Sequence, residues 1–67
     1  MTLEEIKDRI EQIKRIADDD DDEVAHSLED NLRHEVLTAI AQGCSNAQEL
    51  AAEVLKTSDI VFSRWCA

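Results

Sequence analysis

Apolar residues recur at spacings of three and four along the start of the chain, as they do on one face of an amphipathic helix. Thr2 and Glu5 open this pattern with the spacing of a capping box, in which each side chain bonds the other residue's backbone amide. The pattern predicts a first helix over residues 1–17, whose apolar positions form a heptad seam. A seam of about two heptads must pack on the rest of the domain or on a second copy of the chain. The predicted self-association residues are Leu3, Ile6, Ile10 and Ile13.

Five consecutive aspartates followed by Glu23 interrupt the apolar pattern. Like charges repel one another, and aspartate is a poor helix former but a favoured N-cap, so residues 18–22 are predicted to form an acidic loop. A cap near Asp20 would start the next helix and place the acidic side chains at the positive end of its dipole. The run lacks the central glycine and the final glutamate of an EF-hand, so a calcium loop is not expected.

The second half of the chain contains three further helical patterns. A broad apolar face predicts a second helix over residues 23–42, which ends at Gly43 because glycine adopts the left-handed conformation at little cost. Ser45 and Gln48 repeat the capping-box spacing and predict a third helix that starts at Ser45. Apolar residues near the end of the chain do not alternate with polar ones, which predicts a short fourth helix beginning at Asp59.

Length and composition limit the fold class. The chain has 67 residues, with one glycine, no proline and no tyrosine, and strand-rich folds depend on turn residues and aromatics that are scarce here. We therefore expect one all-α domain over residues 1–67 with three to four short helices. In this fold the seamed first helix packs on a trihelical unit formed by residues 23–67.

The charge balance limits the classes of partner. Sixteen acidic residues against seven basic ones give a net charge of −9, which opposes attraction to nucleic acid or to an anionic membrane. No apolar run approaches the length of about 20 residues that spans a bilayer, and no signal peptide is apparent. We therefore expect a cytoplasmic protein, in which Cys44 and Cys66 stay reduced and pack as small apolar residues.

The sequence offers little that points to catalysis or metal binding. It contains no nucleophile elbow, no phosphate-binding glycine loop and no other pattern typical of an active site, so neither an enzyme nor a cofactor is predicted. His26 and His34 lie about two helical turns apart. A zinc site would need Cys44 or Cys66 to join them, and no zinc-binding spacing is present, so no metal is expected.

Part of the second half resembles the helix-turn-helix of bacterial regulators. The string from Gln48 to Leu55, followed by Ser58 to Trp65, has the order of a second helix, a tight turn and a recognition helix. The sequence departs from that pattern because Leu55 replaces the turn glycine and because Arg64 is the only cation of the would-be recognition helix. The resemblance implies a DNA-binding regulator that dimerises through its first helix, which is the alternative function.

A second resemblance covers most of residues 22–67. The segments 25–30 and 36–41, Gly43 and the closing Phe-Ser-Arg-Trp-Cys-Ala of residues 62–67 are similar to small acidic helical proteins of actinobacteria and their phages. This resemblance implies a cytoplasmic setting and a phage origin, and it carries no catalytic residues over.

These features favour a non-enzymatic, acidic protein-binding module, which would act as a phage or bacterial modulator of a host protein. Its acidic half would steer it towards a basic partner, and in one version it would mimic the charge of DNA. The two aromatic residues, Phe62 and Trp65, belong either to the core or to a binding site with Arg64 between them. The predicted partner-binding residues are Phe62, Arg64, Trp65, Asp20, Asp21 and Asp22.

Overall fold

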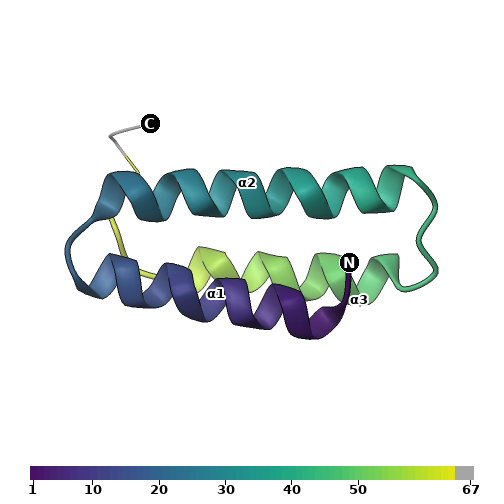
Figure 1. Ribbon diagram of the computed structural model, residues 1–67, viewed down its shortest axis with the longest axis horizontal. Coiled ribbons are helices and arrows are strands. Elements are labelled where there is room, and N and C mark those ends of the chain that lie inside the picture. Colours follow the sequence, from purple (N-terminus) through teal and green to yellow (C-terminus); the bar gives the residue numbers. More distant parts are fainter. Residues whose placement is uncertain (65–67) are drawn as a thin grey trace.

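The computed structural model describes residues 1–64, which form three α-helices packed side by side (Figure 1). They are α1 (Leu3–Asp18), α2 (Asp22–Ala41) and α3 (Ala47–Val54), and a 3-10 helix, η1 (Leu55–Asp59), continues directly from α3. α1 and α3 run in the same direction and α2 runs in the opposite one. The predicted all-α class is confirmed. None of these helices combines the length and the apolar character needed to cross a membrane.

The beginning of α1 follows the predicted capping box only in part. The backbone N–H of Glu5 donates to Oγ1 of Thr2 at 3.2 Å, as expected of an N-cap threonine. The Glu5 carboxylate accepts a hydrogen bond from the Thr2 hydroxyl, also at 3.2 Å, and not from the Thr2 backbone amide. The cap therefore fixes the start of the helix with one of the two expected amide bonds.

Asp20 ends α1 instead of capping α2. Its φ of 62° is left-handed, and its N–H donates to the carbonyl of Ala17 at 3.0 Å. The next N–H, of Asp21, donates to the carbonyl of Ile16 at 3.2 Å, which completes a Schellman motif. The N-cap of α2 is Asp21, without a side-chain capping bond, so the predicted cap near Asp20 is wrong. The linker between the helices is accordingly shorter than the predicted loop, because Asp18 belongs to α1 and Asp22 to α2.

α2 ends at a second Schellman motif. Gly43 has a φ of 86°, and its N–H donates to the carbonyl of Ile40 at 2.9 Å. The N–H of Cys44 donates to the carbonyl of Ala39 at 3.2 Å. The predicted role of Gly43 is confirmed. The predicted capping box at Ser45 is wrong, because the chain needs two further turn residues before α3, whose N-cap is Asn46 without a side-chain bond.

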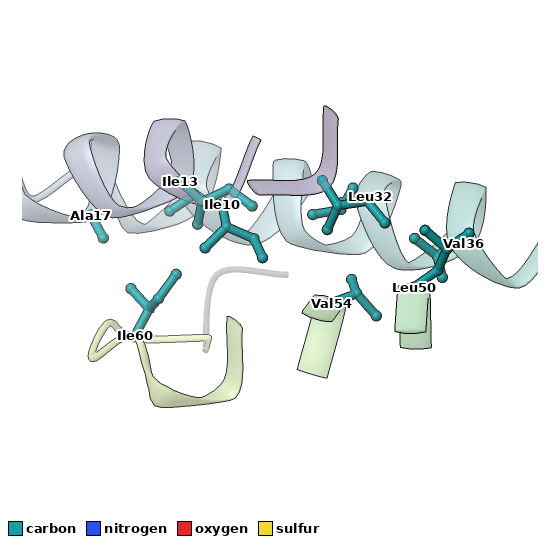
Figure 2. Packing of buried hydrophobic residues seen from close by; sticks show 10 residues of the cluster. Ile10, Ile13, Ala17, Leu32, Val36, Leu50, Val54 and Ile60 are labelled. Atoms are coloured by element: carbon teal, nitrogen blue, oxygen red, sulfur yellow. The ribbon is translucent and has the colours of Figure 1, made fainter. Parts of the chain in front are cut away.

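The heptad seam of α1 packs inside the chain itself. Ile6, Ile10 and Ile13 are at most 5% exposed, and Leu3 is partly buried against the same core. Figure 2 shows Ile10 and Ile13 facing side chains from α2 and from the end of the chain. Of the two expectations for this seam, packing on the rest of the domain is the one observed, because α2 and α3 cover it. Ile6, Ile10 and Ile13 are therefore not offered at the surface for self-association. The buried apolar residues are Ile6, Ile10, Ile13, Ala17, Ala25, Leu32, Val36, Leu50, Val54 and Ile60.

The fourth helix predicted from Asp59 is absent from the described residues. Asp59 is the last residue of η1, Ile60 is extended with φ −78° and ψ 125°, and residues 61–64 have no regular secondary structure. We call residues 60–64 the C-terminal segment. Of the trihelical unit predicted for residues 23–67, the described residues form α2, α3 and η1, with no further helix in residues 60–64. The three packed helices are α1, α2 and α3. The last three residues, including Trp65 and Cys66, lie outside the described part.

Candidate functional site

The C-terminal segment is held against α2 by an ion pair with a buried carboxylate. The side chain of Glu29 faces the core and is 2% exposed. Arg64 donates to it twice, from Nε to Oε1 at 3.0 Å and from Nη2 to Oε2 at 2.9 Å. Such a two-point pair fixes the orientation of the guanidinium as well as its position.

Arg64 also binds the backbone of its own segment. Its Nη2 donates to the carbonyls of Thr57 at 3.2 Å and Ile60 at 3.4 Å, and its Nη1 donates to that of Phe62 at 3.4 Å. The guanidinium carbon lies 3.9 Å from the centroid of the Phe62 ring, within the range of a cation–π contact. One arginine thus satisfies three carbonyls in a stretch that lacks regular secondary structure.

A second arginine completes the polar group, which we call the Glu29 network: Glu29, Arg33, Thr57 and Arg64. Arg33 lies one turn further along α2, with Nη2 3.8 Å from Oε2 of Glu29. It donates to Oγ1 of the fully buried Thr57 at 2.9 Å, while the Thr57 hydroxyl donates to the carbonyl of Val54 at 3.0 Å. The network therefore joins α2, α3, η1 and the C-terminal segment.

The network keeps Glu29 ionised. Burial raises the pKa of the Glu29 carboxyl, but the hydrogen bond from Arg64 and the positive charges of Arg33 and Arg64 outweigh it. The resulting pKa lies below the ordinary value for a glutamate. The hydrogen bond to Glu29 raises the pKa of the Arg64 guanidinium above its already high value.

Two predicted partner-binding residues are thus engaged within the chain. Arg64 is 36% exposed with its charge paired, and Phe62 is partly buried against the core. Trp65, the third member of that group, lies outside the described residues. Glu29 was missed, although it stands at a core-facing position of α2, four residues after Ala25 and three before Leu32, both of which are fully buried. A carboxylate at an apolar position of a helix must find a partner when it is buried, and this pattern could have identified Glu29 from the sequence.

Six adjacent acidic residues occupy the connection between α1 and α2 and the helix ends on either side of it. This connection lies at one end of the bundle (Figure 1). We call residues 18–23 the acidic end. Asp20 and Asp21, two of the predicted binding residues, are exposed, and Asp22 is half-buried. Within residues 1–64, none of the six side chains takes part in an ion pair or a side-chain hydrogen bond. Their charge is available to an external cation.

A groove runs between α1 and the α3–η1 segment. Its floor holds the nearly buried Ile10 and Ile60, and Val61 stands at its edge, 94% exposed. All three lysines of the sequence line it, although the chain as a whole is strongly acidic. We call it the charged groove, lined by Lys7, Ile10, Glu11, Lys14, Asp18, Glu53, Lys56, Asp59, Ile60 and Val61.

One group of side chains has the composition of a metal site. His26, Glu29 and Asp30 bring ligand atoms within 4.8 Å of one another, and Nε2 of His26 lies 3.5 Å from Oδ1 of Asp30. Both oxygens of Glu29 already face Arg64, however, and a second guanidinium stands nearby, so a cation would meet two positive charges. These residues fit an ion-pair network better than a metal centre.

Comparisons with known proteins found no relative of this chain. No family model, no curated protein and no solved structure matches the chain.

Proposed function

We propose that this protein is a non-enzymatic binding module whose acidic end docks on a basic surface of a partner protein. The observation that carries the proposal is the set of six adjacent carboxylates that find no partner within residues 1–64. The fold pairs a buried carboxylate at Glu29 with two arginines, yet gives these six no ion pair within residues 1–64. Charge that the fold does not use remains available for recognition.

The position of the acidic end supports an electrostatic role. Asp18 closes α1, where the helix dipole is already negative, so its charge adds to an unfavourable local field. Asp22 and Glu23 lie in the first turn of α2, where the dipole favours them. A partner that brings lysines or arginines to this end relieves repulsion among the carboxylates. The same field speeds encounter with a basic surface.

A finer form of the proposal is a phage or bacterial modulator that mimics the charge of DNA on a nucleic-acid-binding protein. The net charge of −9 on a chain of 67 residues supports it. Duplex DNA would then displace this protein from its partner, whereas a partner that binds no nucleic acid would be unaffected.

The helix-turn-helix alternative loses its support. The described residues after Asp59 form no recognition helix, and the one cation that would have served it, Arg64, is paired with Glu29. A DNA reader needs several free donors for phosphate contacts.

Capture from a nuclease-treated bacterial lysate tests the proposal, with the tagged wild-type chain as bait. The comparison bait is Asp19→Asn/Asp20→Asn/Asp21→Asn, which neutralises three carboxylates of the acidic end without changing their shape. We expect a discrete protein band that the wild type retains at about 50 mM salt and loses at about 500 mM, because exposed charges are screened at high salt. The variant should not retain it. Equal capture by both baits, or capture insensitive to salt, would contradict the proposal.

A further inference from the structure

The charged groove carries a regular charge pattern along α1. Four of its lining residues are Lys7, Glu11, Lys14 and Asp18, whose spacings of four, three and four place them on one face of the helix. Their charges alternate in sign from plus to minus. If a second copy of the pattern is laid against the first in the opposite direction, each lysine lies opposite an acidic residue.

We propose that a second copy of this chain occupies the groove, with the two α1 helices antiparallel about a twofold axis. The axis passes between residues 12 and 13, the midpoint of the pattern. Lys7 of one copy then lies opposite Asp18 of the second copy, and Glu11 lies opposite Lys14. Because a twofold interface is self-complementary, each pairing occurs twice. A parallel arrangement would bring like charges together and is disfavoured.

The other wall of the groove fits the same arrangement. α1 and α3 run in the same direction (Figure 1). Asp18 ends α1 and Asp59 ends η1, which continues from α3, so both residues belong to the same end of the groove. Both carboxylates then face Lys7 of the second copy. Asp18 and Asp59 thus give that lysine two opposite charges, whereas within residues 1–64 of the single chain its one ion pair is with Glu4, at 3.9 Å.

The lysines of α1 are free enough to make these contacts. The existing pair of Lys14 and Glu11 is 3.5 Å long, and its side chains are 51% and 65% exposed. Pairs as exposed as this one contribute little to folding. A second copy would turn it into an alternating group of four charges on the twofold axis.

Apolar contact adds to the charge pattern. Val61 is 94% exposed at the edge of the groove, next to the buried Ile60. Covering such a side chain removes apolar surface from water and favours association. This surface differs from the heptad seam, of which only Ile10 reaches the floor of the groove. It shares Asp18 with the acidic end but none of residues 19–21, whose charges are removed to test the proposed function, so either proposal can fail without the other.

Repulsion between two chains of charge −9 opposes the dimer. At about 0.15 M salt the screening length is about 8 Å, so charges in contact still interact while most others are screened. We therefore expect a weak dimer, visible in the upper range of accessible concentrations.

Sedimentation equilibrium of the full chain over increasing concentration at about 0.15 M salt tests the dimer. The average mass should rise from 7.6 kDa towards twice that value. Lys7→Glu/Lys14→Glu makes the α1 pattern wholly acidic, and Glu11→Lys/Asp18→Lys makes it wholly basic. Each variant alone should remain monomeric, and an equimolar mixture should dimerise more tightly than the wild type. Circular dichroism establishes that each variant is folded.

Two further variants keep the test decisive. Val61→Asp changes an exposed residue that the fold does not bury, so it should fold normally and raise the dissociation constant about tenfold. Arg15→Glu changes the charge of α1 by as much as Lys14→Glu, but it lies outside the groove and should have little effect. A wild type that stays monomeric at about 1 mM would overturn the proposal, as would a mixture that fails to dimerise.

Discussion

Carboxylates play opposite parts in two regions of this molecule. In the Glu29 network a single glutamate is almost fully buried and receives two hydrogen bonds from Arg64. At the acidic end, six carboxylates stand side by side with no charged partner among residues 1–64. The first region stabilises the fold, because its hydrogen bonds hold the C-terminal segment against α2. The second contributes repulsion and no internal contact.

The difference teaches that net charge alone says little about how a small acidic protein uses its charges. A buried carboxylate must be paired, so its partner becomes part of the structure. An exposed carboxylate has no such requirement. Stability should therefore depend strongly on the Glu29 network and hardly at all on the acidic end.

The largest effect is expected when Arg64 is removed. Arg64→Met leaves the carboxylate of Glu29 buried with the more distant Arg33 as its charged partner, and should cost about 3 kcal/mol of unfolding free energy. Glu29→Gln should cost less, because the released guanidinium is 36% exposed and can reach water. Urea unfolding followed by circular dichroism measures both. If Glu29→Gln lost more unfolding free energy than Arg64→Met, the difference in burial between the two side chains would not explain their effects.

Acid should weaken the same network. Because the folded state lowers the pKa of Glu29, its contribution is fully present above the unfolded value of about 4.3 and is lost as the pH falls through the lower folded value. The stability difference between wild type and Glu29→Gln should stay constant from about pH 7 to pH 5 and shrink below about pH 4. Urea unfolding over this range checks it. A difference that does not shrink at all between about pH 5 and pH 3 would show that the charge of Glu29 is not what matters.

A glycine substitution at the acidic end should raise the free energy of unfolding. Asp20 adopts a left-handed φ of 62°, which glycine adopts without strain, so Asp20→Gly should stabilise the fold by about 1 kcal/mol. Gly43→Ala is the matched opposite case. A Cβ there would meet no atom within 4 Å, so its expected loss of about 1 kcal/mol comes from the backbone alone. Thermal unfolding compares the two. Shifts in the same direction would contradict the Schellman assignment.

Neutralising the acidic end should change stability least. Asp19→Asn/Asp20→Asn/Asp21→Asn removes three charges that make no internal contact, so the unfolding free energy should fall by no more than about 0.5 kcal/mol. Urea unfolding of this variant and of Arg64→Met under the same conditions compares the two regions. A loss near that of Arg64→Met would mean that the acidic end holds the fold together.

The sequence predicted the parts of the fold that local pattern controls. The spacing of Ile6, Ile10 and Ile13 marked the buried face of α1, and Gly43 marked the end of α2. The same spacing could not tell whether the seam meets this chain or another copy. That choice depends on how α2 and α3 pack, which no local pattern contains.

The C-terminal segment was mispredicted for a tertiary reason. Ile60 and Val61 are β-branched and weakly helical, and the carbonyls of Thr57 and Ile60 bond to Arg64 instead of to a following helical turn. Arg64 takes that position because Glu29 lies in the core 35 residues earlier. A contact so distant along the chain leaves no periodic signal. The exposure of Asp20 and Asp21, in contrast, follows from the local run of like charges.

The central claim, that the acidic end serves binding and not folding, is tested most directly by capture with two variants of equal charge. One is the triple asparagine variant of residues 19–21. The other is Glu4→Gln/Asp8→Asn/Glu49→Gln, which neutralises three exposed carboxylates elsewhere and gives the same net charge of about −6. The account predicts that the first loses the nuclease-resistant partner at about 50 mM salt while the second retains it. Equal retention, or equal loss, would show that the position of these carboxylates is irrelevant.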